Sequence, residues 1–269
     1  MRSRIAEQLS LKTYPVALVW SDEAPQGAVQ FKPGTWGCVI SMLAMVAAKG
    51  KTAVFDRNTY GCWGGGVGLG FGNAYESFPG GVECFCGFLS SGNNGSETAR
   101  QIGAHLSGDF GDDFRHGECY LQSPETTKRF LNTLPMREVP TKYVVAKPLK
   151  DIDPEREQIS SITFFVEPDD LSALVNLANH SHPERENVGL PSAAGCQVIG
   201  ILAYRESERD NPRALVGMTD LSARKNVRAL LGKQIMSFTA PLSVFERMER
   251  DLDTAFFQRN TWRALRHNA

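Results

Sequence analysis

Three cysteines lie in sequence contexts that could make a thiol reactive or able to bind metal: Cys38, Cys62 and Cys196. Cys38 and Cys196 each follow a glycine and begin an apolar segment. If those segments fold as helices, free backbone N–H groups and the helix dipole favour negative charge at the thiols. We expect this position to lower the thiol pKa and to promote the thiolate, which binds metal or attacks an electrophile. The alternative is that both are small buried hydrophobic residues.

The segments that follow these two cysteines resemble each other. Residues 36–44 match residues 194–203, with Gln197 as a one-residue insertion, and each segment lies between two β-like runs. The simplest interpretation is an ancient duplication, with halves 1–150 and 151–269 packed as one compact unit around a pseudo-twofold cleft that both sulfurs enter. A chance match of small and aliphatic residues is the alternative.

Cys62 lies in a segment, residues 60–72, that contains seven glycines. Such a density requires positive φ angles or a close approach to another group. The segment lacks both the Lys-Ser/Thr pair of a phosphate loop and a GxGxxG frame, so no nucleotide is expected. We predict a loop in which Gly64, Gly65 and Gly66 direct N–H groups at the sulfides of an iron–sulfur cluster, at an anion or at a developing oxyanion. A purely structural hairpin or lid is the alternative.

Two further features are accessory candidates. Cys84 and Cys86 form a C-x-C pair, which can chelate a metal, but in a strand the two side chains would point to opposite faces. Arg224 follows the β-like run 214–218 at about the same distance in sequence as Cys62 follows the run 52–55. If the two halves are related, the guanidinium of Arg224 lies at the cleft. There it would bind a carboxylate or phosphate. A surface helix arginine is the alternative.

The remaining pattern predicts an α/β or α+β fold with a mixed sheet and packed helices. Ser96 and Ser123 are expected to cap helices, and Asp170 and Asp220 to open two more, while Gly108 is expected to end the first. The β-like runs are residues 15–20, 52–55, 143–146, 162–166, 214–218 and 235–238.

The composition of the chain argues against some classes of function. The 29 basic and 30 acidic residues are mixed along the chain, so the basic excess of a nucleic-acid binder is missing. The N-terminus has no apolar core typical of a secretory signal, and no stretch approaches the length of a membrane span. We therefore expect a cytoplasmic protein that binds neither nucleic acid nor membrane. In that compartment its six cysteines would be reduced thiols or metal ligands.

Taken together, the segments around the three cysteines, the stretch Gly61–Gly70, the run 220–224 and the ending 238–241 resemble the domain of unknown function 169 family over about residues 5–250. The resemblance implies that Cys38, Cys62 and Cys196 match the family's recurrent cysteines. The family is common in archaea and anaerobic bacteria, which is compatible with an oxygen-sensitive cofactor.

Three functional hypotheses follow. In the first, Cys38, Cys62 and Cys196 ligate a four-iron four-sulfur cluster, with Arg224 orienting a small anionic molecule and a redox partner supplying or accepting electrons. Cys84 or Cys86 would be an additional ligand. The second is a non-catalytic small-ligand or metal sensor that uses the same cleft. The third is a metal-free thiol enzyme with Cys38 or Cys62 as nucleophile.

Overall fold

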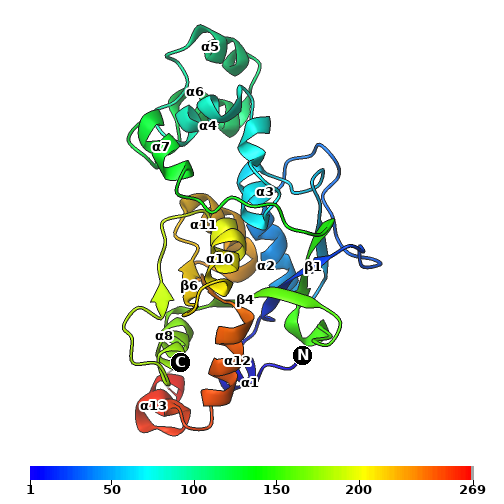
Figure 1. Cartoon of the computed structure of the whole chain (residues 1–269). Coiled ribbons are helices and arrows are strands. Elements are labelled where there is room, and N and C mark those ends of the chain that lie inside the picture. The colour runs from blue at the N-terminus through cyan, green and yellow to red at the C-terminus, as the bar shows by residue number, and fades with distance from the viewer. Residues whose placement is uncertain (268–269) are drawn as a thin grey trace. The chain divides into compact units, whose positions relative to one another are not determined.

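The computed structural model describes residues 1–267 (Figure 1). The strands are β1 Val16–Ser21, β2 Ala53–Phe55, β3 Tyr143–Pro148, β4 Gln158–Val166, β5 Val188–Gly189, β6 Ala214–Gly217 and β7 Met236–Ala240. The α-helices are α1 Arg4–Gln8, α2 Val39–Lys49, α3 Trp63–Leu69, α4 Gly81–Leu89, α5 Glu97–Ala104, α6 Gly108–His116, α7 Pro124–Leu131, α8 Pro168–Ala178, α9 Gly195–Gln197, α10 Ala203–Ser207, α11 Leu221–Leu231, α12 Leu242–Asp251 and α13 Asn260–His267. Short 3-10 helices are η1 Ala74–Ser77, η2 Leu149–Asp151 and η4 Phe256–Gln258, and η3 Val198–Leu202 is a π-helix.

The strands form one seven-stranded mixed sheet in the order β2-β3-β1-β4-β7-β6-β5. Only the β5–β6 pair is parallel among the described strands, and the others pair antiparallel. The predicted α/β class is therefore confirmed. Counted outward from the centre, β1, β3 and β2 follow one another on one side, and β4, β7 and β6 on the other.

One face of the sheet packs against helices α8 and α12. Phe164 and Phe238 from neighbouring strands lie in this core, and the ring of Phe164 stacks on Phe245 of α12 with centroids 6.1 Å apart. Leu174 and Met248 complete the same core and are fully buried. Because burying one such side chain contributes about 1.5–3 kcal/mol, this face supplies much of the stability of the sheet.

The opposite face of the sheet carries small polar side chains beneath the π-helix η3. Ser161 of β4 donates a hydrogen bond to the carbonyl oxygen of Ile199 at 2.8 Å. Thr163 and Thr239 on adjacent strands are joined by a hydroxyl–hydroxyl bond of 3.0 Å, and both are buried. A π-helix leaves backbone groups outside the regular α-helical pattern, and Ser161 provides a buried partner for one of them.

The strand order can be compared with the predicted halves. Strands β1 to β3 lie in residues 1–150 and strands β4 to β7 in 151–269. Each set contains a central strand, then an outer strand, then the strand between them, and the second set adds the edge strand β5. Helix α2 of the first half contacts α11 of the second, and α3 contacts α9 and η3. The pseudo-twofold relation itself stays a prediction.

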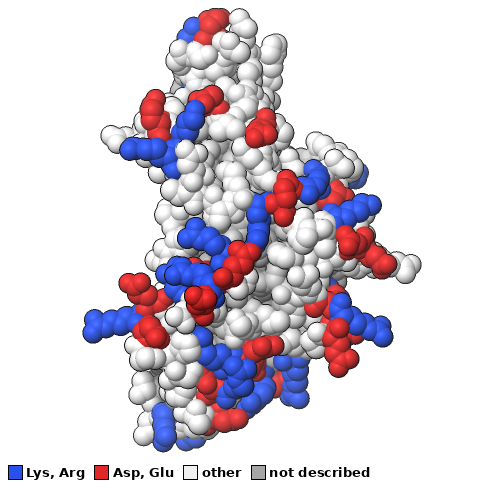
Figure 2. Space-filling view, in the orientation of Figure 1, with Lys and Arg blue, Asp and Glu red and all other residues white. Residues whose placement is uncertain are grey.

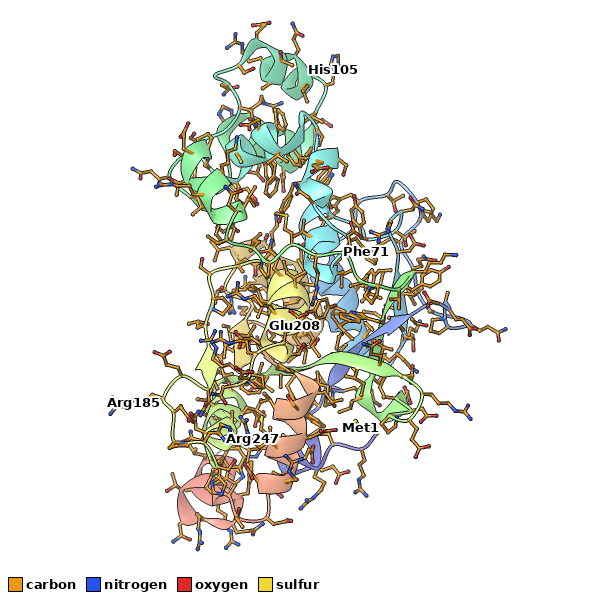
Figure 3. The ribbon with its side chains drawn as sticks, viewed as in Figure 1. Met1, Phe71, His105, Arg185, Glu208 and Arg247 are labelled. Atoms are coloured by element: carbon orange, nitrogen blue, oxygen red, sulfur yellow. The ribbon has the colours of Figure 1, made fainter. Side chains whose placement is uncertain are left out.

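The chain separates into two compact units. Unit 1 comprises residues 1–71 and 138–269, and unit 2 comprises residues 72–137. Phe71, labelled in Figure 3, pairs with Glu138 in an isolated antiparallel bridge, so the chain leaves and re-enters unit 1 at adjacent points. Unit 2 was not predicted as a separate unit, because the glycine-rich segment that ends at Gly72, where this unit begins, was interpreted as part of the cysteine site.

Unit 2 is helical and has a core of its own. Tyr75 stacks on Phe85 with centroids 3.9 Å apart, and Phe78 lies 6.0 Å from Phe114. The buried Asn93 donates to the carbonyl oxygens of Cys84 and Phe114, at 2.9 and 3.0 Å. This amide therefore ties the backbone of α4 to that of α6.

Acidic and basic side chains are mixed over the face shown in Figure 2, as the balanced composition predicts. Among residues 1–267, no helix is both long and apolar enough to cross a membrane.

Six of the seven strands lie at the predicted runs, the short β5 was not predicted, and several other local predictions are wrong. The glycine-rich segment is not a loop, since Trp63–Leu69 forms helix α3. The C-x-C pair lies in helix α4 rather than in a strand. Gly108 begins α6 instead of ending α5, and Glu167, not Asp170, is the N-cap of α8. In the last case Pro168 takes the first helical position, which moves the helix start three residues earlier.

We predict that Gly200→Ala destabilises the protein by about 1–3 kcal/mol, as measured by urea unfolding. A Cβ atom at this position would collide with the carbonyl oxygen of Gly68, a backbone atom that cannot move aside. Alanine otherwise stabilises helices relative to glycine, so the clash determines the sign. Gly95→Ala is the control, because open space surrounds that position and its change should stay within about 0.5 kcal/mol. Equal unfolding curves for Gly200→Ala and the wild type would contradict the close packing.

Candidate cysteine site

Cys38 and Cys62 are both helix N-cap residues. Cys38 precedes α2 and Cys62 precedes α3, each with extended backbone angles. The Cys62 sulfur accepts a hydrogen bond from the backbone N–H of Gly65 at 3.3 Å, and the nearby backbone N–H of Val39 also lowers the pKa of this thiol. Because Val39 directly follows Cys38, the beginnings of the two helices lie close to each other.

Cys196 reaches the same place from the second half of the chain. It lies in the first turn of α9, and its thiol donates to the carbonyl oxygen of Gly64 at 3.1 Å. These two residues are 132 positions apart in the sequence. The charges of Cys38 and Cys62 both act on the Cys196 thiol, so the three sulfurs lie within one electrostatic neighbourhood. Cys196 is buried, and the other two thiols are half-buried.

Glycines make this convergence sterically possible. A Cβ atom on Gly68 would lie 2.7 Å from the carbonyl carbon of Cys196, and one on Gly65 would collide with the Val39 side chain. Both contacts are far closer than side chains tolerate. The glycines of α3 therefore let α9 and α2 approach its backbone directly, and this approach brings the thiols together.

Asp220 is a fourth member of the site that the sequence identified only as a helix cap. It is the N-cap of α11, where one carboxylate oxygen accepts from the N–H of Ala223 at 3.2 Å. The other oxygen accepts from the N–H of Gly195 at 2.9 Å, next to Cys196. Its position soon after the β-like run 214–218 and at the start of a helix is the signal that could have marked it.

The comparison with known families agrees with this geometry. Residues 4–251 match the family DUF169, described as "Uncharacterised ArCR". The chain belongs to the DUF169 family. The resemblance drawn from the cysteine and glycine motifs is thereby confirmed over nearly the same range. Neither the curated proteins nor the solved structures contain a match to the chain.

Two thiols of the site, those of Cys62 and Cys196, have raised pKa values, contrary to the expectation for helix N-termini. Burial, and then the neighbouring Cys38, raise the pKa of Cys62 to about 11, although the N–H groups of Val39 and Gly65 lower it. Burial raises the pKa of Cys196 well above its ordinary value, and Cys62 and Asp220 raise it further. Loss of solvation thus outweighs the helix N-terminus, so both thiols are neutral at pH 7 in the absence of a cation.

Gly64, Gly65 and Gly66 do not form a loop that presents N–H groups to a separate ligand. Gly65 N–H bonds the Cys62 sulfur, Gly64 C=O receives the Cys196 thiol, and Gly66 N–H bonds the carbonyl of Cys62 within the helix. Their contacts are thus with the cysteines themselves. The prediction that they bind a cofactor directly stays untested.

The structure directs the Arg224 side chain to backbone carbonyls. Its guanidinium donates to the carbonyl oxygens of Lys233 at 2.7 Å and Ile235 at 3.1 Å, and it approaches that of Met218 at 3.5 Å. Arg224 is also absent from the groups that shift the pKa values of Cys62 and Cys196. The guanidinium thus joins the end of β6 to the turn before β7, which differs from the predicted placement in an anion-binding cleft.

Among the residues that the structure describes, no group of three or more His, Cys, Asp or Glu side chains is positioned to hold a metal ion. In this arrangement the Cys196 thiol points its hydrogen at the Gly64 carbonyl rather than toward the other sulfurs. Cys84 and Cys86 belong to unit 2, two positions apart on one helix, so their side chains do not face each other.

We predict that Cys62 and Cys196 of the metal-free protein resist iodoacetamide at neutral pH, whereas the exposed Cys119 reacts first. With a pKa of about 11 for Cys62, roughly one part in a thousand is thiolate at pH 8. Peptide mass spectrometry across pH 6–11 measures the order in which the cysteines are alkylated. Alkylation of Cys62 at pH 7 as fast as that of Cys119 would refute the desolvation argument.

The folded state holds these protons more tightly than the unfolded chain. The free energy of unfolding should therefore fall as the pH rises from about 9 toward 11.

We predict that Arg224→Gln lowers the free energy of unfolding by about 1–2 kcal/mol, because three partly buried or exposed carbonyl oxygens lose a charged donor. Arg228→Gln, at an exposed position one turn later on the same helix, is the matched control and should change it by less than about 0.5 kcal/mol. If both variants unfold like the wild type, the contacts described for Arg224 carry no stability.

Proposed function

We propose that Cys38, Cys62 and Cys196 ligate one metal centre, and that this centre acts on or senses a small anionic molecule. An iron–sulfur cluster is the first candidate for the centre. The observation that carries the proposal is the meeting of three thiols from three helix starts that are remote in the sequence. Three cysteine ligands on one cluster leave a position for another ligand or for a substrate.

The electrostatics of the site support this function. The charges of Cys62, Asp220 and Cys38 all disfavour ionisation of the Cys196 thiol, and that of Cys38 also disfavours ionisation of Cys62. No cationic side chain is among the groups that shift the pKa values of Cys62 and Cys196. A buried set of acidic groups without a counterion is costly, and a bound cation offsets that cost.

Binding requires a change at Cys196. A metal ligand must be a thiolate, and a thiolate cannot donate to the Gly64 carbonyl, so the bond of 3.1 Å is lost on deprotonation. The sulfur is then repelled by the carbonyl oxygen and is free to rotate. Meanwhile Gly65 keeps its N–H group on the Cys62 sulfur, as backbone donors do for cluster thiolates.

A cluster bound here would supply electron transfer or a Lewis-acidic iron, while the chain would supply the ligands and a largely buried environment. The anionic molecule enters the proposal from the sequence prediction alone, since Arg224 is engaged with backbone carbonyls.

The raised pKa values argue against the metal-free thiol enzyme. A nucleophilic cysteine needs a depressed pKa or an adjacent base, whereas Cys62 has a pKa of about 11. No histidine is among the groups that act on it.

The test is anaerobic metal and sulfide analysis of the wild type and of Cys38→Ser, Cys62→Ser and Cys196→Ser. We expect a brown wild-type protein with broad absorbance near about 400 nm, and loss of iron and sulfide in each variant, because one shared centre needs all three thiolates.

Cys119→Ser is the matched control, since this cysteine is exposed and lies in unit 2. It should retain the full metal content. A colourless wild type that holds zinc through the same three cysteines would replace the cluster by a zinc site. Full metal retention in all three serine variants would defeat the ligand assignment.

A further inference from the structure

The chain segments that lead into α2 and α3 are in direct backbone contact. A Cβ atom on Gly61 would lie 2.4 Å from the carbonyl oxygen of Gly37, which is closer than any side chain tolerates. These two glycines directly precede Cys62 and Cys38, the N-caps of α3 and α2. The ring of Phe31 packs on both glycines, since a Cβ atom on either would collide with it.

A second contact lies just beyond the two cysteines. A Cβ atom on Gly65 would be 2.3 Å from a methyl group of Val39, the residue after Cys38. Gly65 is also the residue whose N–H bonds the Cys62 sulfur. A disulfide needs its two Cα atoms within about 7 Å of each other. Contacts before and after both cysteines hold Cys38 and Cys62 close together in the way that such a bond needs.

Cys196 is placed differently, because a peptide group stands between it and Cys62. The peptide that joins Gly64 and Gly65 donates its N–H to the Cys62 sulfur at 3.3 Å and accepts the Cys196 thiol on its carbonyl oxygen at 3.1 Å. In a trans peptide the N–H and C=O groups point in opposite directions, so the two sulfurs lie on opposite edges of this group. Cys38 is therefore the partner to which Cys62 has the more direct approach.

Solvent reaches the same pair of thiols. Cys38 and Cys62 are half-buried, whereas Cys196 is buried. The segment 32–36, just before Cys38, is exposed throughout, and the side chain of Trp36 is 65% exposed. A small oxidant can thus approach Cys38 from this side.

We propose that Cys38 and Cys62 form a reversible dithiol–disulfide pair in the metal-free protein, oxidised by a low-molecular-weight disulfide such as glutathione disulfide. Cys196 stays reduced. The inference does not depend on the proposed function, because the pair needs no metal. Where a metal centre does form, the disulfide removes two of its three thiolate ligands, so oxidation prevents metal binding.

The oxidation proceeds by two thiol–disulfide exchanges. First, Cys38 loses its proton and its sulfur attacks one sulfur of glutathione disulfide, and the other glutathione leaves and takes up a proton. Next, the deprotonated Cys62 sulfur attacks the Cys38 sulfur of this mixed disulfide and releases the second glutathione. Two protein thiols are oxidised and one small disulfide is reduced to two thiols. The raised pKa of Cys62 slows the second attack, so the experiment is read at equilibrium.

The experiment equilibrates the metal-free full-length protein with an excess of glutathione disulfide and then blocks the remaining thiols in denaturant. Digestion with trypsin and a glutamate-specific protease places Cys38 in peptide 24–49, Cys62 in peptide 58–76 and Cys196 in peptide 187–205. We expect mass spectrometry to find peptides 24–49 and 58–76 joined in most molecules, and dithiothreitol to separate them again.

Cys196→Ser is the matched variant, because it removes a thiol of the same site and should keep the cross-link, whereas Cys38→Ser and Cys62→Ser should lose it. The map of the wild type needs no variant to fold. If the wild type carries only glutathione adducts, or joins peptide 187–205 to either of the others, the proposed pair is overturned. If the expected cross-link forms while all three serine variants keep their full metal content, the proposed function fails and this inference stands.

Discussion

The direct backbone contact between α3 and the α9–η3 segment is the constraint on which the cysteine site depends. At this contact Gly68 lies against the backbone of Cys196, and Gly200 lies against the carbonyl of Gly68. Helices with ordinary side chains pack with their axes about 8–10 Å apart, and glycine at the crossing permits a closer approach. Only at that approach does the Cys196 thiol reach the carbonyl of Gly64.

The same constraint explains why a glycine-rich segment is helical. Each glycine in a helix interior costs about 1 kcal/mol relative to alanine, so α3 would not form in isolation. Within the fold, α2 and α9 cover it, Cys62 caps its beginning and Gly70 ends it in the left-handed conformation. Packing outweighs local propensity here.

The chemistry of the site follows from a competition between two electrostatic effects. Helix starts bring N–H groups to sulfur, which favours a thiolate, but burial and neighbouring acidic groups disfavour it more strongly. The balance leaves neutral thiols until a cation compensates them, which is the behaviour of a binding site rather than of a free nucleophile. Asp220 adds to this balance and also joins the start of α9 to the start of α11.

The sequence by itself determined the strands, the mixed α/β class, the family and the identity of the three cysteines, because these depend on local hydrophobic runs, caps and short motifs. It misjudged α3, since nothing local reveals that its glycines meet another helix rather than a ligand. It predicted that Arg224 lies at an anion-binding cleft, whereas in the folded chain its guanidinium donates to backbone carbonyl oxygens near β7. The separate unit 2 and the raised thiol pKa values were likewise decided by tertiary structure. Contacts between distant segments and the loss of solvent around a thiol exist only once the chain is folded.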